Sequence, residues 1–243
     1  MKLSITTIEQ ARRYLEHLRE RFQRHAISSK IVGESSDEPI DITIAEMNQF
    51  FDIVDGVDAK KNTFAANDIS DIGEHGISLL EKLKHKADSL KLVAEEKSLQ
   101  QIILVVADWI IEREGSINLL DPIVDALAQI ANATQDQQQL IALAEFMGEI
   151  ADACSDAIKH DLEITNMHRP WRILNINRGI VATRTYDANT MRNVFSMLIK
   201  ALPMDAPGFF KEGMSEMVRL NYPDHVRDVI HEFYEKTEMP LIH

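Results

Sequence analysis

The fold is decided by residues 70–113, which have the sequence SDIGEHGISLLEKLKHKADSLKLVAEEKSLQQIILVVADWIIER. Apolar side chains recur in this stretch at spacings of three and four, as they do along one face of an α-helix. Residues 70–94 supply Ile72, Ile77, Leu79, Leu80, Leu83, Leu90 and Val93, and residues 98–113 supply Leu99, Ile102, Ile103, Val106, Trp109 and Ile110. Two such segments with a short connection predict a pair of antiparallel helices.

The same pattern continues along the rest of the chain. Further helix pairs are expected at residues 121–133 with 136–160, 169–184 with 188–201, and 207–220 with 224–236. No alternating run of strand length bounded by turn residues interrupts them. We therefore predict an all-α fold of irregular antiparallel helical hairpins, packed as a helical bundle or as a short α-solenoid-like array.

The region before these hairpins is more irregular. Residues 1–54 are expected to form an N-terminal helical segment, in which a polar loop at residues 33–39 precedes a helix that begins at Thr43. Residues 55–69 are rich in Asp, Asn and Lys and are predicted to be a loop or a weak domain boundary. On this prediction, residues 70–243 make up the main all-α domain.

The composition is that of an ordinary folded protein, with 45% hydrophobic and 27% charged residues in a chain of 243. The longest apolar run, residues 102–107, stops at Asp108, well short of the roughly 18 to 20 residues that a membrane helix needs. The first residues lack the apolar core of a signal peptide, and the single cysteine cannot form an internal disulfide. The expected location is the cytoplasm, without a membrane partner.

Charge is distributed unevenly along the chain, whose net charge is −13. Residues 34–165 carry nine basic and 27 acidic side chains, whereas residues 166–200 carry six basic side chains and one acidic. Contacts with phosphate dominate the affinity of proteins for nucleic acid, so the acidic remainder of the chain argues against nucleic acid as a partner. Only the basic segment is a local exception.

This arginine-rich segment is the first candidate binding region. Its candidate residues are Arg169, Trp171, Arg172, Asn175, Arg178, Arg184 and Arg192. Arginine suits bidentate contact with carboxylate or phosphate, so the segment could bind a partner protein or, as a second alternative function, bind nucleic acid or another anion weakly. The structural alternative is that these arginines hold the acidic part of the chain or cap neighbouring helix ends.

Methionine is concentrated in the same part of the chain, where seven of the ten methionines lie from Met167 onward. Methionine is flexible and is over-used on adaptable binding surfaces. The chain also lacks the glycine-rich nucleotide-binding motifs and the usual hydrolase and zinc motifs. Our main hypothesis is a non-catalytic cytoplasmic protein without a cofactor, a protein-interaction or scaffold module that binds another protein through a basic, Met-rich C-terminal surface.

A stripe of acidic residues supports a different hypothesis. If residues 136–160 form one helix, the spacings of Glu149, Asp152, Asp156 and His160 place these side chains on one face. Asp228 and His231 are spaced in the same way on the last helix, and the six residues together could hold a divalent metal. The alternative function is a metal-dependent hydrolase, possibly of phosphate esters, in which Arg178 or Arg184 holds the substrate anion. The competing interpretation of the stripe is a solvated helix face.

Overall fold

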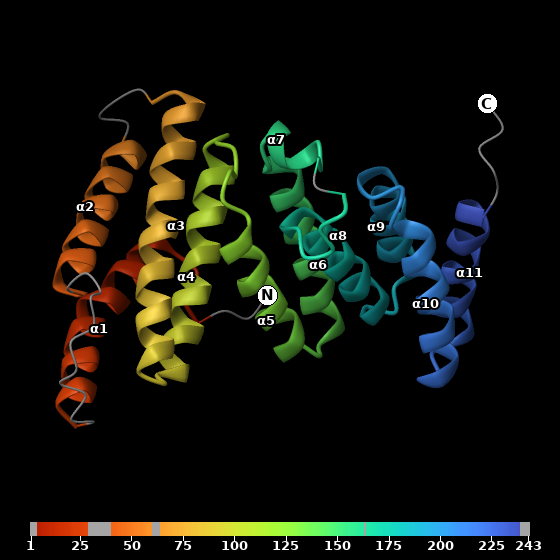
Figure 1. Ribbon diagram of the computed structural model, residues 1–243, viewed down its shortest axis with the longest axis horizontal. Coiled ribbons are helices and arrows are strands. Elements are labelled where there is room, and N and C mark those ends of the chain that lie inside the picture. Colours follow the sequence, from red (N-terminus) through yellow and green to blue (C-terminus); the bar gives the residue numbers. More distant parts are fainter. Residues whose placement is uncertain (1–3, 29–39, 60–63, 163, 239–243) are drawn as a thin grey trace. The chain divides into compact units, whose positions relative to one another are not determined.

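The computed structural model describes residues 4–28, 40–59, 64–162 and 164–238 and confirms the all-α fold (Figure 1). Its helices are α1 (Ile8–Ser28), α2 (Ile40–Asp58), α3 (Ala66–Ser89), α4 (Val93–Glu112), α5 (Asp121–Ala133), α6 (Gln137–Ala153), α7 (Asp156–Lys159), α8 (Pro170–Arg184), α9 (Ala188–Ala201), α10 (Ala206–Arg219) and α11 (Asp224–Glu238). Within the described ranges, the only β structure is an isolated bridge between Ile117 and Cys154. No helix in these ranges has the length and apolar character needed to span a membrane.

The chain forms two compact units, each a bundle of helices. Among the described residues, the N-terminal unit comprises those from 4 to 127 with Ala153–Ser155, and the C-terminal unit comprises Ala128–Asp152 with those from 156 to 238. The division therefore falls inside α5. The boundary predicted at residues 55–69 lies within the N-terminal unit instead, where α2 continues to Asp58 and α3 begins at Ala66. The loop predicted at residues 33–39 lies outside the described residues.

The N-terminal unit is built around α1 to α4. Helix α1 packs against α2 and α4, and α3 packs against the same two helices, which closes a four-helix arrangement. The rings of Phe50 and Trp109 meet edge to face inside it, with centroids 6.4 Å apart. Gly76 lets α3 approach α2 closely, because a Cβ atom at this position would lie 2.5 Å from the ring of Phe50. The apolar periodicity of residues 70–113 thus describes the core of this unit.

The prediction of one continuous helix at residues 136–160 is wrong. Helix α6 ends at Ala153, and the short helix α7 begins at Asp156. Between them, the Ile117 amide donates to the carbonyl of Ala153 (2.8 Å) and the Ser155 amide donates to the carbonyl of Ile117 (3.0 Å). These two bonds take the place of the helical ones that residues 153–155 would otherwise form.

The C-terminal unit contains two of the predicted hairpins, α8 with α9 and α10 with α11, and α9 also packs against α11. Three phenylalanines in its core and a fourth, half-buried one form a cluster whose contacting rings have centroids between 5.2 and 5.9 Å apart: Phe195, Phe210 and Phe233 in the core, and Phe209 at its edge. The Asp187 side chain accepts the Thr190 amide hydrogen bond at the start of α9, a cap that fixes where this helix begins. In this unit the pair α8 and α9 is therefore joined to the pair α10 and α11 through the contact between α9 and α11.

Candidate functional site

Arg169, the first of the predicted site residues, lies inside the C-terminal unit. Its side chain is 4% exposed and forms ion pairs with Asp161 (Nε to Oδ1, 2.5 Å) and Asp205 (Nη2 to Oδ2, 2.7 Å). Its remaining donors bind the carbonyls of Ile164 and Asn166, each at 3.0 Å. Arg169 thereby ties the segment before α8 to the turn before α10.

Arg172 reinforces the same junction one turn further along α8. It donates to Asp205 (Nε to Oδ1, 2.7 Å) and to the carbonyl of Met167 (3.2 Å). Burial alone would raise the pKa of Asp205, but the hydrogen bonds from Arg172 and Arg169 outweigh it and hold this pKa below its ordinary value. We call Arg169, Arg172, Asp161 and Asp205 the arginine junction.

Arg178 and Arg184 join α8 to α6 and to the end of α5, respectively. Arg178 donates to the carbonyl of Ala144 on α6 (3.0 Å), and its guanidinium lies against Gly148, where a Cβ atom would be 2.3 Å away. Burial lowers the pKa of Arg178, and Asp152 opposes that effect. Arg184 donates to the carbonyls of Ala131 and Thr134 at the C-terminal end of α5, so it caps that helix.

The other three predicted residues also make contacts within the unit. Trp171 is 8% exposed, and its indole donates to the carbonyl of Ala201 at 3.4 Å. Asn175 is buried and donates to the carbonyl of Trp171 (2.9 Å). Arg192 is half-exposed and pairs with Glu232 of α11 at 3.1 Å. The seven predicted residues therefore do not converge on one exposed site, and most of them connect α8 or α9 to another part of the unit.

The acidic residues of the metal hypothesis are separated by the break after α6. Glu149 and Asp152 are exposed on α6, while Asp156 and His160 belong to α7 and the turn that follows it. His160 Nδ1 lies 2.5 Å from the carbonyl oxygen of Asp156.

On α11, Asp228 is exposed and His231 lies 3.6 Å from Glu235. Among the residues that the structure describes, no group of three or more His, Cys, Asp or Glu side chains is placed to hold a metal ion.

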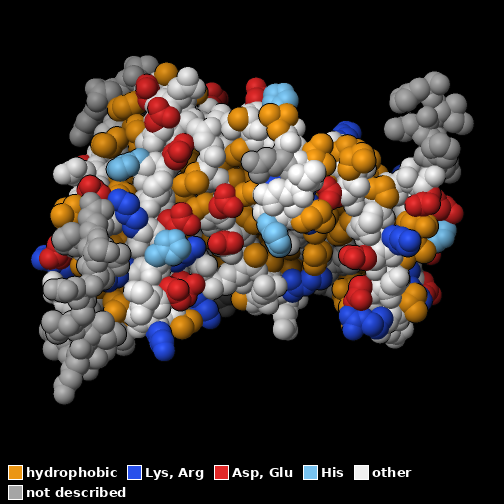
Figure 2. Space-filling view, in the orientation of Figure 1, with side chains coloured by type: hydrophobic (Ala, Val, Ile, Leu, Met, Phe, Trp, Pro, Cys, Tyr) orange, Lys and Arg blue, Asp and Glu red, His pale blue; other side chains and the backbone are white. Residues whose placement is uncertain are grey.

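Exposed apolar side chains are concentrated in the C-terminal part of the chain, where the sequence did not show which individual side chains reach the surface. Twelve large hydrophobic residues are exposed in the described ranges, and nine of them belong to the C-terminal unit: Leu162, Ile164, Met167, Ile180, Tyr186, Met197, Met204, Val218 and Leu220. Figure 2 shows hydrophobic side chains gathered over α8 and the nearby end of α9. The periodicity of α8 and α10 could not have revealed this, because exposure depends on which neighbours cover each face.

Four of these residues form what we call the methionine patch: Leu162, Ile164, Met167 and Met204. Leu162 is 85% exposed and Met204 is 77% exposed. The arginine junction holds their two segments at one end of the unit, since it bonds to the carbonyls of Ile164 and Met167 and to Asp205, the neighbour of Met204. Of the methionines from Met167 onward, Met167, Met197 and Met204 are exposed, whereas Met191 and Met217 are buried.

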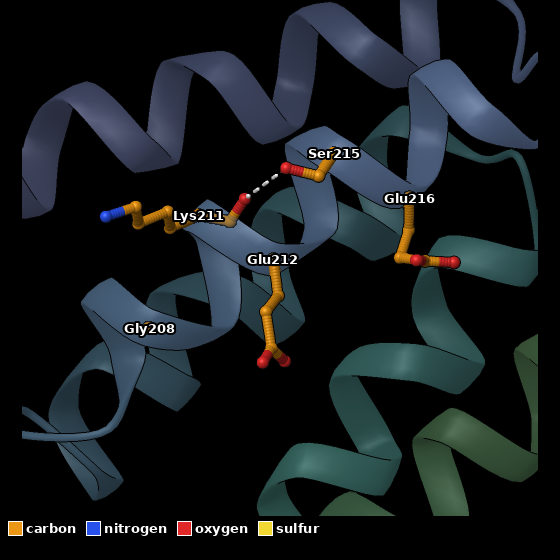
Figure 3. Close-up of a pocket in the computed structure, with 5 residues that line it drawn as sticks. All are labelled: Gly208, Lys211, Glu212, Ser215 and Glu216. Carbon is orange, nitrogen blue, oxygen red and sulfur yellow. Dashed lines mark hydrogen bonds between the residues drawn. The ribbon is translucent and has the colours of Figure 1, made fainter.

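A second apolar feature is a groove of about 390 Å³ lined by α8, α10, α11 and the turn before α11, which we call the α8–α10 groove. Its apolar lining consists of Ile176, Ile180, Phe209, Met217, Leu220, Tyr222 and Ile230, and its polar lining includes Thr183, Arg184, Glu212 and Glu216. A shallower hollow of about 680 Å³ adjoins it along α10 and shares Glu212 and Glu216 with it (Figure 3).

Comparison with known proteins finds no matching family model, no matching curated protein and no matching solved structure.

Proposed function

We propose that the protein is a non-catalytic protein-interaction or scaffold module whose binding surface lies on the C-terminal unit. The observation that carries this proposal is the concentration of nine of the twelve exposed large hydrophobic side chains in that unit. Contiguous exposed apolar surface on a folded protein marks sites that associate with other molecules. The single buried cysteine supports a cytoplasmic location.

The arginine-rich segment has a supporting part in this proposal. Arg169 and Arg172 hold the two segments that carry the methionine patch, and Arg178 and Arg184 fix α8, which lines the groove. Their guanidinium groups are occupied by intramolecular acceptors, which weakens the alternative of an anion or nucleic-acid binder that needs them free. The apolar and methionine side chains supply the contact area.

The experiment that tests this proposal is quantitative affinity capture from an extract of the source cells, with three surface variants compared with the wild type. The first, Leu162→Glu with Met204→Glu, charges the methionine patch. The second, Ile180→Glu with Leu220→Glu, charges the groove. The control, Val93→Glu, places the same charge on an apolar residue of the N-terminal unit that is 57% exposed. Circular dichroism confirms that each variant is folded.

We expect at least one protein to be captured by the wild type and by Val93→Glu and to be lost with one or both C-terminal variants. Reconstitution with that purified protein, measured by calorimetry, then shows that the interaction is direct. Capture that is equal for all four proteins, or lost only with Val93→Glu, contradicts a binding surface on the C-terminal unit. An empty capture also counts against the proposal, because a binding surface predicts at least one partner.

A further inference from the structure

Two tyrosines from different helix pairs meet in the C-terminal unit. The rings of Tyr186 and Tyr222 lie edge to face, with centroids 5.3 Å apart and an angle of 83° between their planes. We propose that this pair is an oxidative modification site, at which a peroxide-driven reaction joins the two rings covalently and links the turn after α8 to the turn after α10. Such a site is independent of the proposed interaction function and adds a covalent chemistry to it.

The backbone fixes the position of both rings. Tyr186 follows the last turn of α8 in the left-handed conformation, with a φ of 54°, and its carbonyl oxygen lies 3.0 Å from Nε2 of His225 in the first turn of α11. The Tyr222 amide donates to the carbonyl of Met217 (3.0 Å) at the end of α10. Each turn is thus tied to a neighbouring helix, so the two rings stay in contact in the folded protein.

Two phenols in contact can undergo oxidative coupling. Each ring loses one electron and the proton of its hydroxyl group and becomes a phenoxyl radical. The two radicals join through a bond between ring carbons next to the hydroxyl groups, and each of these carbons then passes its hydrogen, as a proton, to the oxygen of its own ring. The product, dityrosine, has two electrons and two protons fewer than the original pair. A peroxide accepts both electrons as its O–O bond breaks.

Access and contact single out this pair among the four tyrosines of the chain. Tyr186 is 40% exposed, so an oxidant in solution can reach its ring, and Tyr222 is half-buried beside it. Tyr14 lies on α1 of the N-terminal unit, and Tyr234 is a half-buried residue of α11. The structure describes all four, and only Tyr186 and Tyr222 have their rings in contact with each other. Groups held in contact react far faster than groups that must meet by diffusion, which favours coupling within this pair.

The covalent link closes a long stretch of chain. Tyr186 and Tyr222 are 36 positions apart, and helices α9 and α10 lie between them in the sequence. A covalent bond across such a loop lowers the conformational entropy of the unfolded chain. Oxidation at this site should therefore stabilise the C-terminal unit.

The test is brief photo-oxidation of the full-length protein at low protein concentration, with a ruthenium bipyridyl complex as the one-electron oxidant and persulfate as the peroxide. Trypsin cleavage at arginine places Tyr186 in the peptide 185–192 and Tyr222 in the peptide 220–227. We expect mass spectrometry to find these two peptides joined, with their summed mass less two hydrogen atoms, in a monomeric protein. Dityrosine that maps mainly to the other two tyrosines, or that joins two protein chains, overturns the inference, as does oxidation without any dityrosine.

Matched variants and urea separate a reaction directed by the fold from random coupling. Tyr222→Phe keeps the ring and removes the phenol, and we expect its yield of dityrosine to be lower by about tenfold or more, because no other tyrosine is held in contact with Tyr186. The control Tyr234→Phe removes a phenol from the same unit and should leave the yield within about twofold of the wild type. Oxidation of the wild type in urea should lower the yield of the joined peptides as strongly as Tyr222→Phe lowers that of dityrosine. Equal yields for the two variants, or equal yields with and without urea, contradict the site.

The stability of the cross-linked protein tests the effect of the link. Circular dichroism in urea should give a higher unfolding midpoint for the photo-oxidised wild type than for photo-oxidised Tyr222→Phe, which has received the same oxidant dose without forming the link. The untreated proteins provide the reference for the substitution itself. If treatment raises the midpoint of the wild type no more than that of the variant, the link does not stabilise the unit and the proposal fails.

Discussion

The two units bury their arginines differently. In the N-terminal unit, Arg12 pairs with Asp52 at the surface, where the two side chains are 29% and 76% exposed. In the C-terminal unit, Arg169 and Asp161 are 4% and 14% exposed. The N-terminal unit also hides its apolar residues in a closed four-helix arrangement and leaves only three of the twelve large exposed ones at its surface. The N-terminal unit thus leaves little apolar surface exposed, whereas the C-terminal unit combines a buried polar junction with most of the exposed apolar side chains.

The chain offers a way to observe each unit separately. Its two tryptophans are buried in different units, Trp109 in the N-terminal and Trp171 in the C-terminal unit. Fluorescence of the Trp171→Phe variant therefore reports on the N-terminal unit, and that of Trp109→Phe reports on the C-terminal unit. Urea unfolding of these two backgrounds gives the free energy of unfolding for each unit, and the variants below are made in both.

The largest expected effect is that of removing the centre of the arginine junction. Arg169→Met leaves the buried Asp161 without its cation and leaves Asp205 with Arg172 alone, and the loss of one partner costs about 3–5 kcal/mol in comparable buried pairs. We expect the free energy of unfolding that Trp171 reports to fall by this amount, and the free energy of unfolding that Trp109 reports to change little. The control Arg13→Met breaks the exposed pair with Glu9 and should cost less than about 0.5 kcal/mol. A loss that is equal in both reporters would show that the units do not unfold independently.

Low pH should lower the stability of the C-terminal unit, because it protonates Asp205. The pKa of this carboxyl is held below its ordinary value of 3.8, so its contribution is complete above that value and is lost as the pH falls through the lower pKa of the folded state. The effect is smaller than that of Arg169→Met, because a protonated Asp205 leaves Asp161 paired with Arg169. Melting curves at pH 7, 5, 4 and 3 check this. Asp205→Asn should be less stable than the wild type at pH 7 and should lose less stability between pH 5 and pH 3. Parallel pH profiles for the two proteins would remove Asp205 as the cause.

Replacement of a helical glycine by alanine should change the free energy of unfolding differently in the two units. Gly76→Ala places a Cβ atom 2.5 Å from Phe50, which is 1% exposed and has no room to move, so we expect a loss of about 1–3 kcal/mol. Gly179→Ala places one 2.7 Å from Phe209, which lies at the edge of the open groove and can shift. Alanine is more favourable than glycine inside a helix by about 1 kcal/mol, and this gain offsets the cost of the close contact between the new Cβ atom and Phe209. Urea unfolding measures both, and an equal loss at the two sites would mean that the groove is as rigid as the closed core.

These differences also show what could be predicted from the sequence. The helix pairs were predictable because apolar periodicity is a local property, as in residues 70–113. The end of α6 was not predictable, because it depends on one hydrogen bond that Ile117 donates and one that it accepts, and Ile117 is 36 positions away from Ala153. The arginine-rich segment was recognisable, but the partners of Arg169 and Arg184 lie on other elements and appear only in three dimensions. The groove was hidden for the same reason, since exposure is decided by packing.

The smallest expected effect concerns the arginine of the segment that remains at the surface. Arg192 pairs with Glu232 at 3.1 Å, and the two side chains are 49% and 37% exposed. Such exposed pairs contribute about 0–1 kcal/mol, so Arg192→Met should reduce the free energy of unfolding reported by Trp171 by no more than this. The comparison of Arg192→Met with Arg169→Met by urea unfolding keeps the residue type and the replacement constant and changes the burial of the arginine and the number of its partners. If Arg192→Met lowers the free energy of unfolding as much as Arg169→Met does, the burial of Arg169 is not the reason for its contribution. The stability of the C-terminal unit would then depend on exposed arginines as much as on buried ones.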